Sequence, residues 1–144
     1  MLDSKTIAVD FDGTIVENRY PKIGKPILFA IETLLHLQKD GHLLILWTYR
    51  SGRELREAVE FCNQKGINFY AVNKSYPEEI YDESLSRKIQ ADIFIDDRNI
   101  GGLRGWGEIY HELASTPMKA KFTNKKKKKE TSGKGILKYI KSKL

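Results

Sequence analysis

The sequence predicts an α/β fold, a Rossmann-like three-layer sandwich around a mainly parallel sheet. Short apolar runs alternate with segments of helical spacing, which is the pattern of parallel strands joined by helical crossovers. Three of the apolar runs end in an acidic or hydroxyl residue, at Asp10, Thr48 and Asp96. Because parallel strands present their carboxyl ends at one edge of a sheet, and ligands bind there, we expect these side chains at a common rim.

The first strand is expected at Thr6 to Val9, which is apolar on both faces like a buried central strand. Residues 17–26, which contain two prolines and a glycine, then predict a loop. Apolar residues at helical spacing predict a helix from Ile27 to Lys39. Asp40 and Gly41 end it, with the glycine suited to a left-handed cap.

A second buried strand is expected at Leu43 to Trp47, followed by a helix that runs to about Lys65. Ser51 can cap the start of this helix, and Glu54 three residues later completes the pattern of a capping box.

The rest of the body predicts two more strands, at Asn68 to Val72 and at Ala91 to Ile95. The residues between them, from Asn73 to Ser84, have no clear period and are expected to be irregular. A glycine-rich loop and a short helix from about Trp106 to Leu113 follow.

The 144 residues fit one domain with a tail. The net charge of +6 is unevenly divided: residues 1–118 hold 14 Lys and Arg against 18 Asp and Glu, a net of −4. Residues 119–144 hold eleven Lys and one Glu, a net of +10, and could end in a short basic amphipathic helix. This lysine-rich tail could bind nucleic acid or an anionic membrane surface, or remain a solvated end.

Several classes of protein are excluded. Cys62 is the only cysteine, so the chain can form neither an intrachain disulfide nor a cysteine-based zinc cluster. No apolar run is longer than the five residues of Leu43 to Trp47, which is much shorter than the roughly 20 residues of a membrane span. The first residues do not have the pattern of a signal peptide, so a cytoplasmic protein is expected.

The residues at the strand ends indicate phosphoryl chemistry. Asp10 and Asp12 follow the first strand, and Asp96 and Asp97 follow the fourth. Four converging carboxylates repel one another unless a cation lies among them, and Mg²⁺ prefers such oxygen ligands. A carboxylate can also attack phosphorus while its neighbour acts as acid and base. In this interpretation Thr48 and Lys88 supply a hydroxyl donor and a positive charge for the phosphoryl group.

Together these motifs resemble the haloacid dehalogenase (HAD) superfamily of phosphohydrolases, over roughly residues 5–113. Four motifs carry the resemblance: Asp10-Phe-Asp12-Gly-Thr after a strand, Thr48, Lys88, and the pair Asp96-Asp97. The resemblance implies that Asp10 is the nucleophile and a Mg²⁺ ligand. Asp12 would be the general acid and base, with its backbone carbonyl on the metal. Thr48 and Lys88 would hold the phosphoryl group, although Lys74 competes with Lys88 for that role. Asp96 would be the acidic metal ligand, and Asp97 would ligate through water or orient Lys88, with the direct ligand of the two left open.

The resemblance further implies a member without a large cap domain, because the insertion after the first motif is only a loop, in which Tyr20 could form part of a small flap. An open site of this kind suits a large substrate or a lid from another subunit, so an oligomer is possible. Arg50 and Arg53 are expected to be solvated, although Arg50 could reach a substrate anion.

Two functions therefore remain open. The first is a Mg²⁺-dependent phosphatase that works through a phospho-aspartate at Asp10, on a phosphorylated substrate whose class the sequence does not give. The alternative is a catalytically idle phosphate-binding module that the tail of residues 119–144 tethers to nucleic acid.

Overall fold

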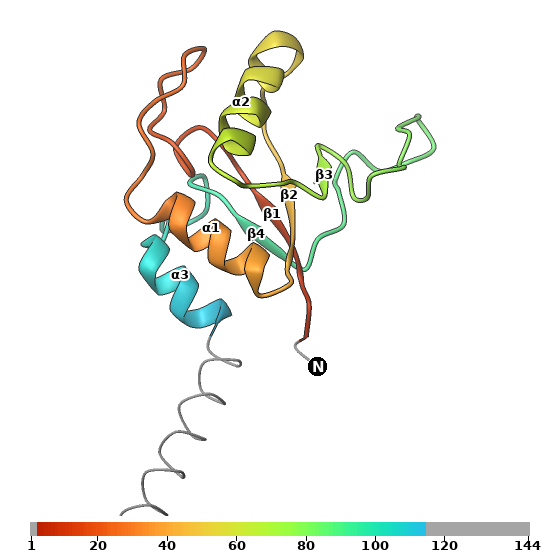
Figure 1. The fold of residues 1–144 in the computed structure, drawn as a ribbon. Coiled ribbons are helices and arrows are strands. Elements are labelled where there is room, and N and C mark those ends of the chain that lie inside the picture. The colour runs from red at the N-terminus through yellow and green to blue at the C-terminus, as the bar shows by residue number, and fades with distance from the viewer. Residues whose placement is uncertain (1–2, 115–144) are drawn as a thin grey trace, which may run out of the picture.

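The structure, a computed structural model, describes residues 3–114 and confirms the α/β prediction (Figure 1). Four strands form one all-parallel sheet in the order β3-β2-β1-β4. The strands are β1 (Thr6–Val9), β2 (Leu43–Leu46), β3 (Ala71–Val72) and β4 (Ile93–Ile95).

Three helices pack on the same face of this sheet: α1 (Ala30–Lys39), α2 (Gly52–Gln64) and α3 (Trp106–Leu113). Alternate strand residues point to this face and form the main core with the helices, since successive side chains of a strand lie on opposite sides. The fully or almost fully buried members of this core include Ile7, Val9, Leu44 and Leu46 from the strands and Leu34, Leu37, Ala58, Cys62 and Trp106 from the helices.

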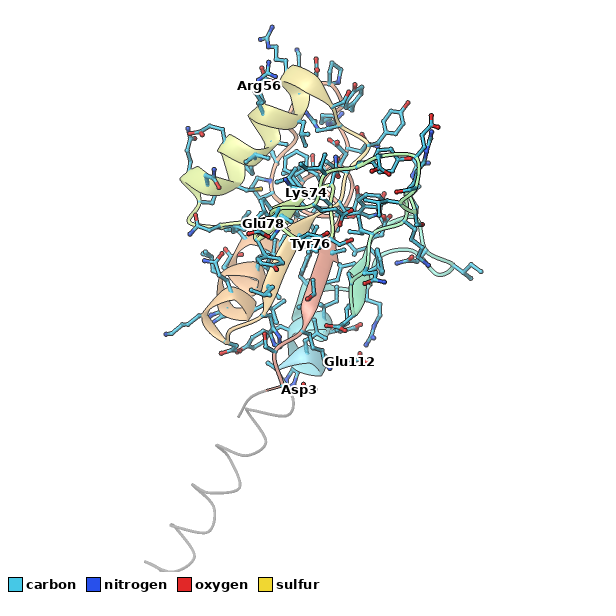
Figure 2. The ribbon with its side chains drawn as sticks, turned by 90° about the vertical axis from the view of Figure 1, so that its right-hand side faces the viewer. Asp3, Arg56, Lys74, Tyr76, Glu78 and Glu112 are labelled. Atoms are coloured by element: carbon cyan, nitrogen blue, oxygen red, sulfur yellow. The ribbon has the colours of Figure 1, made fainter. Side chains whose placement is uncertain are left out.

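The opposite face of the sheet is covered by irregular chain. Ala8, Ile45 and Ala71 point to this side and pack under Ile89, with Trp47 and Ala91 against them. Ile89 and Ala91 belong to the connection between β3 and β4, in which residues 73–92 form no helix or strand. Figure 2 shows Lys74, Tyr76 and Glu78 of this connection on the side of the sheet that faces the viewer. The third layer of the sandwich is therefore a long loop.

Some expected boundaries are wrong. Helix α1 begins at Ala30, because the backbone of Phe29 is left-handed (φ 65°) and the Ala30 N–H closes a turn onto the Ile27 carbonyl at 3.0 Å. Ser51 does precede α2, but its side chain makes no capping hydrogen bond, so the capping box does not form. Strand β3 keeps only two of the five residues expected for it.

The residues that follow β1 form loops up to the start of α1, with only isolated bridges at Asp12–Val16 and Val16–Pro26. Within residues 3–114 the sheet thus carries no second domain over its carboxyl edge. None of the helices in this range is both long enough and apolar enough to cross a membrane. The lysine-rich tail and its expected terminal helix lie outside the described residues.

Candidate active site

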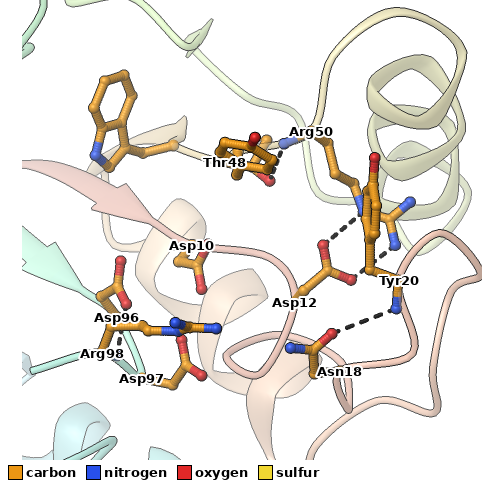
Figure 3. Close-up of a pocket in the computed structure, with 11 residues that line it drawn as sticks. Asp10, Asp12, Asn18, Tyr20, Thr48, Arg50, Asp96, Asp97 and Arg98 are labelled. Atoms are coloured by element: carbon orange, nitrogen blue, oxygen red, sulfur yellow. Dashed lines mark hydrogen bonds and ion pairs between the residues drawn. The ribbon is translucent and has the colours of Figure 1, made fainter.

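The register of the sheet brings the strand ends together. Val9 at the end of β1 pairs with Leu46 of β2 on one side and with Ile95 of β4 on the other. Beyond the strand, the Asp10 N–H donates to the Ile95 carbonyl at 3.0 Å. Asp10, Thr48 and Asp96 consequently meet at one rim, as the sequence predicts. They line a cavity of about 680 Å³ together with Asp12, Asn18, Tyr20, Trp47, Tyr49, Arg50, Asp97 and Arg98 (Figure 3).

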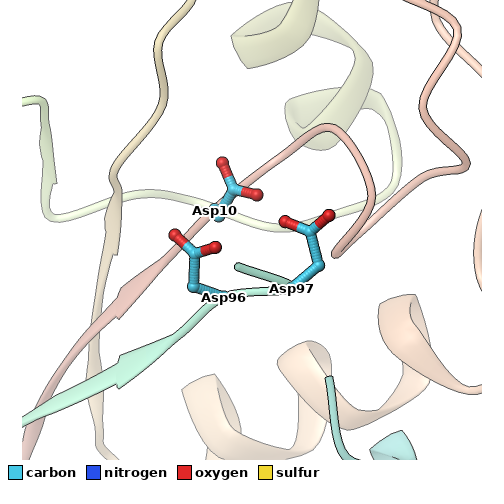
Figure 4. Close-up of side chains that lie close together, drawn as sticks. All are labelled: Asp10, Asp96 and Asp97. Carbon is cyan, nitrogen blue, oxygen red and sulfur yellow. The ribbon is translucent and has the colours of Figure 1, made fainter. Parts of the chain in front are cut away.

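Three carboxylates form a tight cluster on one side of this cavity (Figure 4). Oxygens of Asp10, Asp96 and Asp97 all lie within 4.8 Å of one another. Burial raises the pKa of Asp10 to about 7; the hydrogen bond from Thr14 opposes this rise and the negative charge of Asp96 adds to it. None of these three carboxylates forms an ion pair within residues 3–114, so a cation between them would relieve their mutual repulsion.

Thr14, the last residue of the first motif, ties the cluster together. Its side chain is fully buried, and its hydroxyl donates to Asp10 Oδ2 at 2.9 Å while it accepts the Asp97 N–H at 3.1 Å. The indole N–H of Trp106 in turn donates to the Thr14 carbonyl at 2.8 Å. Sequence reasoning gave Thr14 no role of its own, although its place in the motif was a usable signal.

Gly13 is required where the first motif passes Asp97. Its φ of 83° lies in the left-handed region, and a Cβ at this position would collide with the Asp97 carboxylate. The close approach of the two segments therefore depends on a residue without a side chain.

Arg50 is the largest departure from the sequence prediction at the site. Its side chain is completely buried, whereas the sequence predicted a solvated residue; the Arg53 side chain is 80% exposed, as expected. Two guanidinium nitrogens of Arg50, Nε and Nη2, donate to the two Asp12 oxygens at 2.7 Å each. No local sequence pattern predicts this ion pair, because Arg50 and Asp12 are 38 positions apart in the chain.

Thr48 is placed to donate a hydrogen bond into the cavity. Its backbone N–H donates to the Asn73 side chain at 2.8 Å, which fixes the end of the strand. Its hydroxyl oxygen accepts the Arg50 N–H at 3.2 Å, a bond that leaves the hydroxyl proton free for a ligand.

Neither Lys88, expected at the phosphoryl group, nor its alternative Lys74 lines the cavity. The Lys88 ammonium lies 5.9 Å from the centroid of the Phe94 ring, and Lys74 lies on the segment that follows β3. Arg98 lines the cavity instead. Its backbone N–H donates to Asp96 Oδ1 at 2.7 Å, and its guanidinium makes no hydrogen bond or ion pair with any residue in 3–114.

Fold and rim together define a class: a Rossmann-like α/β protein with a carboxylate-rich cavity at the carboxyl ends of its strands. Comparisons with protein-family models and with curated proteins gave no match. Among solved structures, the chain is similar to a conserved protein coded by a locus of Bacteroides thetaiotaomicron. The identity is 56% and the TM-score 0.74, and the match covers 79% of this chain and 93% of that one. The chain belongs to the same family as that protein.

Proposed function

We propose that the protein is a Mg²⁺-dependent phosphohydrolase of the HAD type that works through a phospho-aspartate at Asp10. The convergence of Asp10, Asp96 and Asp97, with Asp12 and Thr48 on the same cavity, carries the proposal. This arrangement agrees with the order and strand contexts of the motifs that resemble the HAD superfamily.

The donor set fits Mg²⁺. The three clustered side chains are half-buried carboxylates that open onto a cavity, and Mg²⁺ takes one or two carboxylates and keeps several waters and phosphate oxygens. Asp10, Asp96 and Asp97 would hold the ion. When bound, it would neutralise the cluster and polarise a phosphoryl oxygen.

The side chains of the cavity then divide the reaction between them. A carboxylate oxygen of Asp10 attacks phosphorus and the bond from phosphorus to the leaving oxygen breaks. Asp12 gives that oxygen a proton, which it holds at a lone pair that Arg50 leaves free. Water next attacks the phosphorus of phospho-Asp10, Asp12 takes a proton from the water, and the bond to Asp10 breaks to release inorganic phosphate. The Thr48 hydroxyl and the Arg98 guanidinium stabilise the negative charge on the phosphoryl oxygens.

The remaining walls of the cavity favour a phosphate ester that carries a flat ring. About 680 Å³ is more than a phosphoryl group fills, and the rings of Tyr20, Trp47 and Tyr49 line the space. Tyr49 is 95% exposed although it is a large aromatic residue. Stacking of a base on such a ring is worth about 1–3 kcal/mol, so Tyr49→Ala should raise KM for a nucleoside monophosphate about tenfold and leave KM for glycerol phosphate unchanged.

Steady-state kinetics on the two substrates measure this difference. Tyr76→Ala is the matched control, since Tyr76 is a half-exposed tyrosine outside the cavity lining. Equal effects of Tyr49→Ala on both substrates would rule out stacking by Tyr49.

The activity itself is tested with p-nitrophenyl phosphate and a panel of nucleotides and sugar phosphates. Wild-type protein should turn over at least one of them only with Mg²⁺, and Asp10→Asn should abolish the turnover. Turnover by Asp10→Asn at the wild-type rate, or no Mg²⁺-dependent turnover of any substrate, would overturn the proposal.

A further inference from the structure

Arg50 connects two parts of the cavity wall that come from different regions of the chain. One is Asp12, in the first motif. The other is the flap, residues 17–26, whose backbone carbonyls at Pro21 and Lys22 also accept hydrogen bonds from Arg50. In Figure 3 the Arg50 side chain extends from the segment just before α2, dashed lines join it to Asp12, and the Tyr20 ring of the flap overlaps its guanidinium.

The hydrogen-bonding capacity of this guanidinium is fully used. An arginine has five N–H donors. Nε and Nη2 donate to the two Asp12 oxygens at 2.7 Å each, and the second Nη2 proton goes to the Lys22 carbonyl at 2.8 Å. Nη1 donates to the carbonyls of Pro21 at 3.0 Å and Glu54 at 3.4 Å. No donor remains for a substrate anion, so the geometry excludes the substrate contact that the sequence left open for Arg50.

Two aromatic rings also pack against the guanidinium. Its central carbon lies 5.0 Å from the centroid of the Phe11 ring and 5.2 Å from that of the Tyr20 ring, distances at which a cation is attracted to an aromatic face. Arg50 is 1% exposed as a whole residue. A buried cation with a carboxylate partner is costly to disrupt, because removing one partner leaves the other charge without compensation.

We propose that Arg50 is the positioning residue of this site: it fixes the Asp12 carboxylate and anchors the flap to it, so that the acid/base group and the cavity wall are set as one unit. Each Asp12 oxygen keeps a further acceptor position beyond its bond to Arg50, and Asp12 still lines the cavity. The acid/base part of the inference rests on the proposed function, whereas the anchoring of the flap does not.

Lysine cannot take over this role. An ammonium is a compact charge with three donors, whereas the planar fork of arginine matches both carboxylate oxygens and at the same time reaches the two backbone carbonyls of the flap. Arg50→Lys should therefore keep the positive charge but lose the connection between Asp12 and the flap.

Limited trypsin digestion tests the anchoring without any enzyme assay. The flap contains two cleavable bonds, after Arg19 and after Lys22. Cleavage there should be about tenfold or more faster in Arg50→Lys and Arg50→Gln than in wild type. In the control Arg53→Gln, which removes an exposed arginine three residues away, trypsin should cleave the flap at the wild-type rate. Unchanged flap cleavage in folded Arg50 variants would overturn the anchoring.

Circular dichroism identifies variants that fail to fold. If Arg50→Gln unfolds, the double variant Asp12→Asn/Arg50→Gln removes both charges and is digested in its place. Fast cleavage of the flap in this folded double variant supports the anchoring, and cleavage at the wild-type rate contradicts it.

A double-mutant cycle in the full chain tests the acid/base part. With p-nitrophenyl phosphate the leaving group needs no proton, so the phospho-enzyme forms even in Asp12→Asn, and its hydrolysis can be followed after a chase. Arg50→Lys should slow this hydrolysis at least about tenfold in wild type but have little further effect in Asp12→Asn, because both act through one carboxylate. Additive effects would contradict the positioning role.

The two parts of the inference can fail separately. Wild type without any phosphatase activity would overturn the proposed function, while the trypsin digestion would still decide whether Arg50 anchors the flap.

Discussion

The position of Asp10 in the site strongly raises the pKa of its carboxyl group. An aspartate has an ordinary pKa of 3.8, and burial against Asp96 raises it to about 7 in the metal-free protein. The folded state therefore holds a proton between these two pH values that the unfolded state has already released. A group with a raised acid pKa destabilises the folded state progressively as pH rises through that window.

The stability of metal-free protein should consequently fall as pH rises from about 4 to about 7, and Asp10→Asn should lack this part of the decline because an amide does not titrate. Mg²⁺ should raise the Tm of wild type near pH 7 and leave Asp10→Asn almost unchanged, since a ligand that binds only the folded state stabilises it. Thermal unfolding in EDTA and in Mg²⁺ across this pH range measures both effects. The same pH slope in the two proteins would refute the assignment to Asp10.

Either Arg98 or Lys88 could supply the positive charge that binds the phosphoryl group, and the two positions differ in the structure. Arg98 lines the cavity with its guanidinium unpaired among residues 3–114, whereas Lys88 lies over Phe94 outside the lining. A hydrogen bond to a charged group is worth about 1.5–3 kcal/mol, so Arg98→Gln should lower kcat/KM by about 10- to 100-fold. Lys88→Gln serves as the comparison and should have an effect below threefold. The opposite order of effects would return the role to the lysine that the HAD resemblance implies.

At the scale of single elements, local pattern accounts for most of the sheet and helices but not for their contacts. Strand β1 and helix α3 have their expected bounds, because apolar runs and turn residues are read within a few positions. The start of α1 depends on the left-handed backbone at Phe29, which nothing in a helical stripe indicates. The ion pair of Arg50 and Asp12 depends on the packing of α2 against the first motif, which no local window contains.

Helix α3 supports the first motif through one hydrogen bond. The Trp106 indole N–H donates to the Thr14 carbonyl at 2.8 Å, and Trp106 is 2% exposed. Trp106→Phe keeps an aromatic ring but leaves this buried carbonyl without its donor, which should cost about 1–3 kcal/mol of unfolding free energy.

Because Thr14 also holds Asp10, Trp106→Phe should weaken Mg²⁺-dependent stabilisation as well. Urea unfolding with and without Mg²⁺ measures both quantities. Tyr76→Phe, at an exposed position outside the cavity lining, is the control and should match wild type. A Trp106→Phe protein with unchanged stability would show that the hydrogen bond contributes nothing.

On the scale of the whole molecule, the sequence predicts the position of the site better than it predicts the segments that surround the sheet. The acidic rim follows from a parallel sheet alone, because the carboxyl ends of its strands share one edge. The structure adds that β1 lies between β2 and β4 and ends beside both. The covering of the second sheet face by residues 73–92 does not follow, since an irregular segment has no periodic pattern. The net charge of +6 is likewise a sum of two unlike parts, and only the body of −4 contains the cavity.

The tail can be separated from the body by changing charge in the full chain. Replacing Lys125–Lys129 with glutamine leaves six Lys and one Glu in residues 119–144, so the net charge there falls from +10 to +5. If the tail binds nucleic acid, its affinity for RNA or DNA should fall and the dependence on salt should become shallower, since each phosphate contact contributes a slope of about 0.9. Phosphatase activity on a small substrate should not change, because the replaced lysines lie outside the catalytic motifs.

Binding isotherms at several salt concentrations, beside kinetics of the same variant and of Asp10→Asn, separate the two functions left open by the sequence. A phosphatase loses turnover in Asp10→Asn and keeps it in the lysine variant. A catalytically idle module has no turnover in any of the proteins. In that case only the lysine variant differs from wild type, through weaker binding to nucleic acid. Loss of both properties in the lysine variant would mean that the tail takes part in the reaction, and then the division into an acidic catalytic body and a separate basic tail would be wrong.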